Sequence, residues 1–208
     1  MFTSIKFGLT ELWRDWFWGK HKKYSGGAAS ICNQIVEDRW NGHFFDVGDK
    51  HFKDQFWLRD IAICTPSLIQ IGNKDRLKTT FEWALETYKR SGQITTTIDL
   101  QGNSFDLPCY GADTLPLFLF AIKTLKYYEL AKKNKKFLNN EIDKYYSLVF
   151  DQTTKTVKPV FFSVPKDTIE VRGSCASAVF LVLLADLLRE DFKFLKNPFK
   201  ENDLKNPF

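Results

Sequence analysis

The chain has 208 residues, of which 44% are hydrophobic, 16% aromatic and 26% charged, and its formal net charge is +5. This length and composition are typical of a globular chain with one core-forming domain, and they exclude a disordered protein. The lysines gather in two short runs without the aromatic and basic interleaving of nucleic-acid binders, so no nucleic-acid partner is predicted.

The cysteines and the apolar runs exclude further classes. Four cysteines lie far apart, without a C-x-x-C pair or a histidine cluster, so we expect no metal site, no disulfide framework and no cofactor. The N-terminus lacks the features of a signal peptide. The longest apolar run, residues 176–188, is shorter than the roughly 20 residues that span a bilayer. These features predict a cytoplasmic protein without a membrane partner.

The first quarter of the chain predicts one helix and one loop. Residues 2–19 carry aromatic and aliphatic side chains at helical spacing, which predicts an amphipathic N-terminal helix. Two glycines then break the chain, and residues 28–36 fit either a short strand or a turn of helix. Asn41-Gly42 and Gly48-Asp49 mark turns, so residues 38–55 are predicted to form a structured loop.

A helical hairpin is predicted next. Its first helix begins either near Asp60, with Pro66 inside it, or at Pro66 itself, and continues to Gly72. Asn73 is predicted to cap the second helix, and Gly92 to end it. Residues 94–98 and 105–107 flank a Gln-Gly-Asn turn and predict a β-hairpin.

The second half of the chain predicts three more helices. Asp113 is predicted to cap the first of them, and residues 139–150 form the next, followed by an extended segment over residues 156–164. Residues 174–189 are apolar almost all round, so this last helix is predicted to be buried on every side. Residues 1–190 therefore read as one domain of about seven helices, and residues 191–208 as a proline-containing tail.

One stretch places two charges within apolar surroundings. Arg59 and Asp60 stand between Trp57 and Ile61, and charges beside apolar surface are costly unless they have partners. The pair is either an ordinary helix start, with Asp60 near the positive end of the macrodipole and Arg59 solvated, or a polar site beside a Trp ring that suits a sugar. Polar residues before successive helices favour a helical ring with a site at its mouth.

Two segments resemble a known family. The Trp-Leu-Arg-Asp-Ile-Ala stretch from Trp57 is similar to the W-x-R-D-x-A stretch of glucoamylases and related six-hairpin glycosidases. The Tyr-Gly-Ala-Asp-Thr-Leu-Pro stretch from Tyr110 resembles the next inner-helix entrance of these toroids. The resemblance implies an all-α, partial (α/α)6 toroid with short β-hairpins at its mouth. It also implies a sugar-binding set, namely Trp57, Arg59, Asp60, Tyr110, Asp113 and Arg172.

A third segment, residues 167–174, lies where this family presents its catalytic and substrate-binding carboxylates. If the Glu-Val-x-Gly-Ser spelling of glucoamylase is matched, Glu170 contacts the substrate and Ile169 falls on the acid. If the debranching-type pattern is matched, Asp167 is the acid, and we favour this register. The alternative is that Asp167 and Glu170 are surface charges beside Lys166 and Arg172.

The resemblance implies a carbohydrate-active, glycoside hydrolase-like protein, inverting in mechanism, that acts on or binds α-linked glucose-type sugars. A complete six-hairpin ring has twelve helices, and its later half normally supplies the catalytic base. We therefore expect an oligo- or polysaccharide ligand, together with a second copy of the chain or a second-half protein as partner. The alternatives are a non-catalytic carbohydrate-binding or interaction subunit, and an isomerase or lyase that uses His51 as a base.

Overall fold

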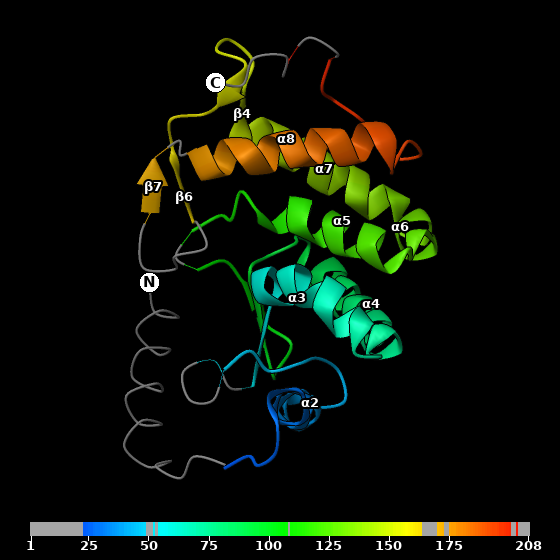
Figure 1. Cartoon of the computed structure of the whole chain (residues 1–208). Coiled ribbons are helices and arrows are strands. Elements are labelled where there is room, and N and C mark those ends of the chain that lie inside the picture. Colours follow the sequence, from blue (N-terminus) through cyan, green and yellow to red (C-terminus); the bar gives the residue numbers. More distant parts are fainter. Residues whose placement is uncertain are drawn as a thin grey trace.

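The computed structural model describes residues 23–48, 52, 54–107, 109–163, 170–172, 175–200 and 203. This part of the chain is mostly helical, with a few short antiparallel strands (Figure 1). The helices are α2 (Ala28–Arg39), α3 (Leu58–Gln70), α4 (Lys74–Ser91), α5 (Thr114–Leu125), α6 (Tyr128–Lys133), α7 (Lys135–Val149) and α8 (Cys175–Glu190). The strands are β1 (Gln55–Trp57), β2 (Thr97–Asp99), β3 (Ser104–Phe105), β4 (Phe150–Asp151), β5 (Thr156–Val157), β6 (Phe161–Ser163) and β7 (Glu170–Arg172). The helix predicted over residues 2–19 lies outside the described residues.

Helix α5 is the centre of the fold. It packs against α3 on one side and α8 on the other, while α4, α6 and α7 also contact it. Figure 1 shows α3, α5 and α8 as one layer of helices that all begin on the same side of the molecule, on the left of the view. Nine of the twelve residues of α5 are buried, because an apolar helix between two neighbours has almost no side left for solvent.

Helix α8 corrects one prediction. It was expected to be buried on every side, but Val179 is 50% exposed and Asp186 is also exposed. The reason is its place in the layer: α5 covers one side of α8, whereas α5 itself has neighbours on two sides. Helix α8 therefore presents part of its apolar surface outside the described core.

The boundaries of α3 decide between the two predicted starts. The helix begins at Leu58, before Asp60, and runs through Pro66. Proline has no N–H group to donate at this position. The Thr65 hydroxyl, one residue earlier, donates to the carbonyl of Ile61 at 2.8 Å and adds a bond to the same turn.

The other helices decide one open alternative and correct two predictions. Residues 28–36, left open between strand and helix, lie within α2. Helix α6 was not predicted, and α7 begins at Lys135 rather than near residue 139. Asn73 precedes α4 as predicted, but its side chain makes no capping bond and instead accepts a hydrogen bond from Arg76 at 3.1 Å. Gly92 does end α4, with a positive φ of 80°.

The predicted β-hairpin is present as β2 and β3, which pair antiparallel. A third strand, β1, extends this sheet, with Phe56 opposite Ile98. Strand β1 leads directly into α3, and the Leu58 amide donates to the Thr96 carbonyl at 3.0 Å. The hairpin and the first turn of α3 are therefore joined by backbone hydrogen bonds.

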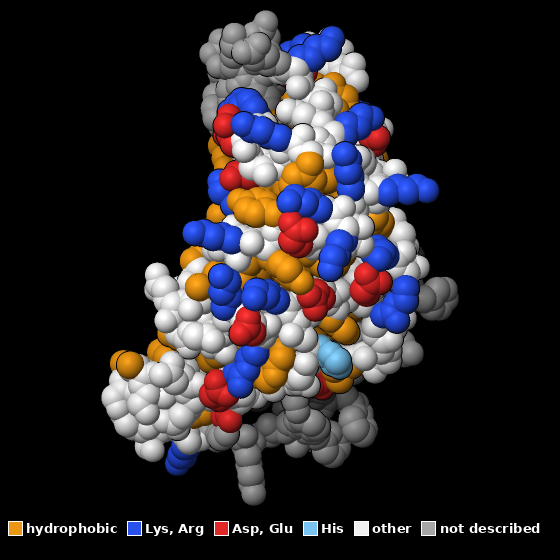
Figure 2. Space-filling view, turned by 90° about the vertical axis from the view of Figure 1, so that its right-hand side faces the viewer, with side chains coloured by type: hydrophobic (Ala, Val, Ile, Leu, Met, Phe, Trp, Pro, Cys, Tyr) orange, Lys and Arg blue, Asp and Glu red, His pale blue; other side chains and the backbone are white. Residues whose placement is uncertain are grey.

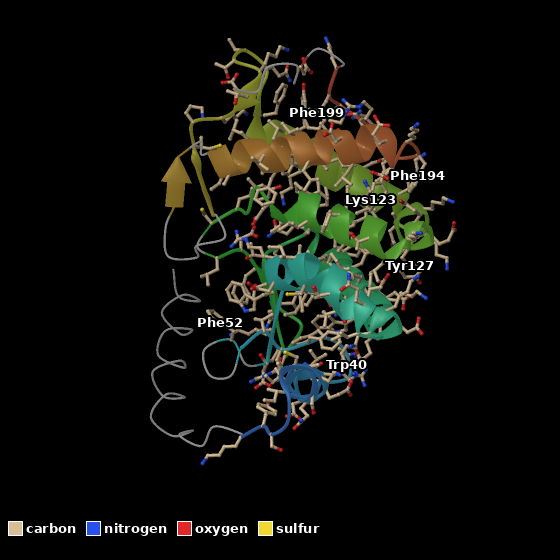
Figure 3. All side chains as sticks on the ribbon, viewed as in Figure 1. Trp40, Phe52, Lys123, Tyr127, Phe194 and Phe199 are labelled. Atoms are coloured by element: carbon tan, nitrogen blue, oxygen red, sulfur yellow. The ribbon has the colours of Figure 1, made fainter. Side chains whose placement is uncertain are left out.

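Residues after α8 add to the same core. Phe192, Leu195 and Phe199, the last labelled in Figure 3, are buried. The Phe199 ring lies 5.7 Å from the Phe150 ring. The Lys196 amide donates to the Asn139 side chain of α7 at 2.8 Å. The described part of the segment predicted as a tail thus packs on α7 and on the β4–β5 hairpin.

Candidate functional site

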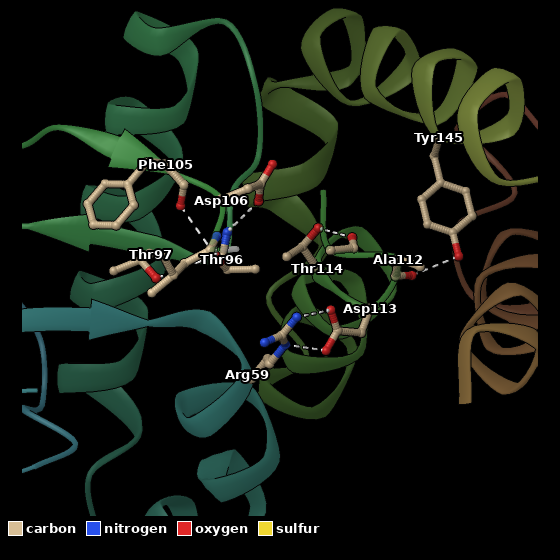
Figure 4. A network of polar contacts seen from close by, with 11 residues as sticks. Arg59, Thr96, Thr97, Phe105, Asp106, Ala112, Asp113, Thr114 and Tyr145 are labelled. Carbon is tan, nitrogen blue, oxygen red and sulfur yellow. Dashed lines mark hydrogen bonds and ion pairs between the residues drawn. The ribbon is translucent and has the colours of Figure 1, made fainter. Parts of the chain in front are cut away.

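An ion pair joins the starts of α3 and α5. Arg59 lies in the first turn of α3 and Asp113 immediately precedes α5, 54 residues later in the chain. The guanidinium donates from Nε to Oδ2 and from Nη2 to Oδ1, the latter at 3.1 Å (Figure 4). The side chains are 4% and 1% exposed. This is a buried bidentate pair, the strongest class of charge-assisted hydrogen bond.

This pair corrects one prediction about local structure and decides against one of the two alternatives for Arg59. Asp113 occupies the position before α5 that a capping residue would take, but its side chain makes no capping bond to the helix. Arg59 is buried, whereas an ordinary helix start would leave it solvated. The two side chains satisfy each other, so the unusual charge of the Trp-Leu-Arg-Asp stretch is partly explained by a partner from a distant segment.

Asp60 and Trp57 lie apart from this pair. Adjacent residues of a helix point about 100° apart, and Asp60 is exposed where Arg59 is buried. Trp57 is only 2% exposed. Its Nε1 donates to the Gln55 side chain at 3.0 Å, and the Phe52 ring lies 5.1 Å away. The ring face that was predicted to stack on a sugar is therefore covered.

Asp106 is a polar residue near the ion pair that the sequence analysis did not single out. It follows β3, and its Oδ1 accepts a hydrogen bond from the Thr96 amide at 3.0 Å. Burial raises the pKa of Asp106 to about 6; Asp113 adds to this shift, whereas the Thr96 bond and the charges of Lys144 and Arg59 oppose it. The signal in the sequence was a carboxyl between two apolar residues of a predicted strand.

Tyr110 and Glu141 complete the group. Burial raises the pKa of the Tyr110 phenol, and the carboxyls of Glu141, Asp106 and Asp113 raise it further. Glu141, on α7, is 4% exposed and accepts a hydrogen bond from the Ile94 amide at 2.7 Å. We call Arg59, Asp106, Tyr110, Asp113 and Glu141 the amino-end cluster.

Hydroxyl groups fix the backbone around this cluster. The Tyr145 hydroxyl donates to the carbonyl of Ala112 at 2.8 Å, and the Thr114 hydroxyl donates to the carbonyl of Gly111 at 2.8 Å (Figure 4). The Tyr88 hydroxyl donates to the carbonyl of Thr95 at 2.8 Å. Buried polar groups of this kind are costly without partners. Their pairing holds the loop before α5 in one conformation.

The electrostatics of the cluster suit proton exchange and hydroxyl binding. Burial raises the pKa of Asp113 although the Arg59 guanidinium opposes the shift, and burial also raises the pKa of Glu141. Three carboxyls with raised pKa values thus lie near one guanidinium and the phenol of Tyr110. Perturbed groups gathered in this way are a feature of binding and catalytic sites as well as of structural ion-pair networks.

The remaining predicted residues belong to the segment before α8. Glu170 and Arg172 lie in β7, which pairs with β6 so that Glu170 is opposite Ser163 and Arg172 opposite Phe161. Strand β7 lies near the start of α8, on the side where α3 and α5 also begin (Figure 1). The structure describes only the backbone of these two residues. Asp167 and His51 lie outside the described residues.

Three further observations concern metal binding, a second groove and membrane spans in the described residues. In the described ranges, no group of three or more His, Cys, Asp or Glu side chains is arranged to hold a metal ion. A groove of about 580 Å³ lies on α2 and shares no residue with the cluster; Ser30, Asn33, Gln34, Glu37 and Asp38 line it. None of the described helices is long and apolar enough to cross a membrane.

The side of the molecule where α3, α5 and α8 end is a mixed surface. Figure 2 shows lysine and arginine side chains interspersed with carboxylates and small apolar areas on this face. Exposed ion pairs such as Lys132–Glu129, at 2.8 Å, belong to it. Pairs of this kind are typical of a solvated surface and contribute little to stability.

No protein family, curated protein or solved structure matches this chain.

Proposed function

We propose that the chain is a glycoside hydrolase-like, carbohydrate-binding protein that takes α-linked glucose-type sugars at the amino ends of α3 and α5. The observation that carries the proposal is the buried Arg59–Asp113 pair. Its two members come from separate stretches, and each stretch resembles a sugar-binding entrance of six-hairpin glycosidases. A shared site requires these stretches to meet, and they are in direct contact.

The arrangement of helices supports the finer part of the proposal, a partial (α/α)6 toroid. In such a ring the inner helices are parallel neighbours and the connections before them form the mouth. Helices α3, α5 and α8 are neighbours that begin on one side, with α4 and α7 packed against the layer (Figure 1). Three parallel helices in one layer, of which α3 and α5 are each followed by helices that pack against them, correspond to about half of the inner helices of a ring.

Within the proposed site the residues have different roles. Asp60 is exposed and would accept hydrogen bonds from sugar hydroxyls, whereas the Arg59–Asp113 pair is buried and positions the two helix starts. Tyr110 would bind the sugar from its position in the loop before α5. Glu170 and Arg172 would contact sugar from the segment before α8. Trp57, being buried, would shape the site from behind rather than stack on the ring.

Hydrolysis with inversion needs a protonated acid and an ionised base, roughly 6.5–9.5 Å apart. We propose Asp167 as the acid, and a second carboxylate from a partner as the base. The partner would be a second copy of the chain or a protein with the other half of the ring. The exposed apolar side chains of Ile63 on α3, Ile71 just after α3 and Val179 on α8 support such a partner.

Isothermal titration calorimetry with maltose and acarbose tests the binding. We expect the wild-type chain to bind, and Asp60→Asn to weaken binding by about 1.5–3 kcal/mol, because a charged hydrogen-bond acceptor is lost. Asp75→Asn is the matched control, since Asp75 lies in the first turn of α4, is exposed and pairs with Lys78 at 3.0 Å. Absence of binding, or equal losses in the two variants, would reject the proposed site.

Turnover is a separate test. The purified chain alone is expected to hydrolyse aryl α-glucosides weakly or not at all, because one carboxylate cannot both protonate the leaving oxygen and activate water. With a partner, Asp167→Asn should abolish activity on substrates with poor leaving groups and keep part of it on glycosyl fluorides. Robust hydrolysis by the isolated monomer, unchanged in Asp167→Asn, would contradict both assignments.

A further inference from the structure

A five-residue sequence occurs twice after α8. Residues 195–199 and residues 204–208 both read Leu-Lys-Asn-Pro-Phe. Helical and strand periodicity constrain the class of a residue rather than its identity, so neither accounts for an exact repeat. The structure describes the first copy, whereas the second lies outside the described residues. The contacts of the first copy therefore show what this sequence binds.

The polar contacts of the first copy are made with α7. The Lys196 amide donates to Asn139 Oδ1 at 2.8 Å, and its Nζ lies 2.7 Å and 2.9 Å from the two carboxylate oxygens of Asp143. Asn139 and Asp143 are four residues apart, so they lie on the same side of the helix. Within the copy, the Asn197 side chain accepts a hydrogen bond from the Phe199 amide at 3.1 Å, which fixes a turn.

Phe199 makes the apolar contact. Its ring centroid lies 5.3 Å from that of Tyr146 and 5.7 Å from that of Phe150, both in edge-to-face geometry. The polar and aromatic partners follow one line along α7 and just past its end. We call this set the tail-binding surface: Asn139, Asp143, Tyr146 and Phe150. From Asn139 to Tyr146 the helix rises about 10 Å, a length that three residues of extended chain also span.

We propose that the tail-binding surface recognises the sequence Leu-Lys-Asn-Pro-Phe, and that residues 204–208 are its second ligand, which binds when residues 195–199 leave. In the exchanged state Lys205 would take the place of Lys196, and Phe208 that of Phe199. The second copy offers the same amide, ammonium group and ring at the same spacing. The proposal does not depend on a sugar, because no residue of the amino-end cluster takes part.

Two features favour the first copy in the wild-type chain. Helix α8 ends at Glu190, so residues 191–194 connect it to the first copy, whereas residues 191–203 would connect it to the second. The longer connection lowers the equilibrium constant for docking about sixfold. Asp203 adds to the preference: while the first copy is docked, its carboxylate accepts hydrogen bonds from Lys155 Nζ at 2.9 Å and from the Lys200 amide at 2.8 Å.

Urea unfolding of full-length single and double variants tests the exchange. In the wild type, Phe208→Ala should change the equilibrium constant for unfolding by less than about twofold, because the first copy occupies the surface. In Phe199→Ala the second copy binds instead, so adding Phe208→Ala should raise this constant at least about tenfold, as expected for the loss of a packed ring. Glu201→Ala, which lies outside both copies, is the control in the Phe199→Ala background and should have less than about a twofold effect.

An equal effect of Phe208→Ala in both backgrounds, including no effect in either, would overturn the proposal. If Phe199→Ala does not fold, Phe199→Leu takes its place and native-state hydrogen exchange decides. The Lys205 amide should then be protected at least about tenfold more than in the wild type, because it donates to Asn139. Unchanged exchange of this amide would contradict the second ligand.

Discussion

Gly111, in the loop before α5, lies against Thr96, the residue that precedes β2. A Cβ atom at this position would lie 2.8 Å from the Thr114 methyl group and 2.9 Å from the Thr96 methyl group. Real Cβ contacts are essentially never this short, so both contacts would have to lengthen through a shift of the threonines or of the backbone. Since both threonines also make hydrogen bonds around the amino-end cluster, the packing at Gly111 and the polar network are coupled.

The first prediction is that Gly111→Ala destabilises the fold by roughly 1–3 kcal/mol through overpacking. Urea unfolding followed by circular dichroism measures the change. Gly27→Ala is the control, because nothing lies within 4 Å of a Cβ there and the backbone is extended, with φ of −72°. The explanation would be wrong if both variants lost the same small amount of stability.

The second prediction concerns the buried ion pair. Asp113→Ala removes the bidentate acceptor of a buried guanidinium, and we expect a loss of roughly 3–5 kcal/mol in the free energy of unfolding. Glu37→Ala breaks the exposed pair with Arg76, whose side chains are 34% (Arg76) and 60% (Glu37) exposed, and should cost less than about 1 kcal/mol. Comparable losses for the two variants would show that the buried pair is not a structural requirement.

At the level of the elements, the residue that ends α5 has a strained backbone conformation, whereas the residue that ends α4 does not. Helix α4 ends at Gly92, with a φ of 80°, while α5 ends at Lys126, with a φ of 56°. A residue with a Cβ atom is disfavoured in this left-handed region by roughly 1–2 kcal/mol, and glycine is not.

The third prediction follows: Lys126→Gly should raise the free energy of unfolding by about 1 kcal/mol, and Gly92→Lys should lower it by a similar amount. Thermal melts of the two variants give the comparison. A stabilising Gly92→Lys, or a destabilising Lys126→Gly, would contradict the assignment of these two residues as equivalent helix ends.

Periodicity predicted the elements whose signals are local. The apolar stripes of α3, α4 and α5 and the Gln-Gly-Asn turn of the hairpin are properties of adjacent residues, and all are present. Strand β1 was not predicted, because three residues beside a helix start give no alternation and its strand character depends on pairing with β2. Helix α6, with six residues, is too short for a periodic signal.

The site was predictable only in part, for a similar reason. The charge of Arg59 within apolar surroundings signals that a partner is needed, but the partner lies 54 residues away and local pattern cannot select it. Asp113 was assigned to a helix cap because its position fits one, and the tertiary contact with Arg59 prevailed over it. Asp106 was read only as part of a predicted hairpin strand, because the local sequence does not show that Arg59, Lys144 and Asp113 lie near it.

For the whole molecule, apolar side chains on or next to the two outer helices of the layer, α3 and α8, are partly exposed. Ile63 is 58% exposed, Ile71 46% and Val179 50%. The fourth prediction is that the chain forms a dimer in solution, and that Val179→Glu shifts it toward monomer because a charge at an apolar interface is costly. Light scattering after gel filtration measures the mass. Leu100→Glu, at a hairpin position with 53% exposure, is the control and should leave the mass unchanged.

A monomeric wild type would argue against a second copy as the missing half of the ring. It would not test the sugar site itself, because that site depends on the starts of α3 and α5 within one chain. The central claim is therefore tested best by mapping where a sugar binds.

Amide chemical-shift mapping by NMR, with maltotriose added to the isotope-labelled chain, makes this measurement. The sugar-site proposal predicts saturable shifts that are largest at Asp60, Tyr110 and Asp113, where the first turn of α3 meets the loop before α5. Shifts confined to the groove residues of α2, such as Asn33 and Gln34, would contradict it, as would no shifts at millimolar sugar.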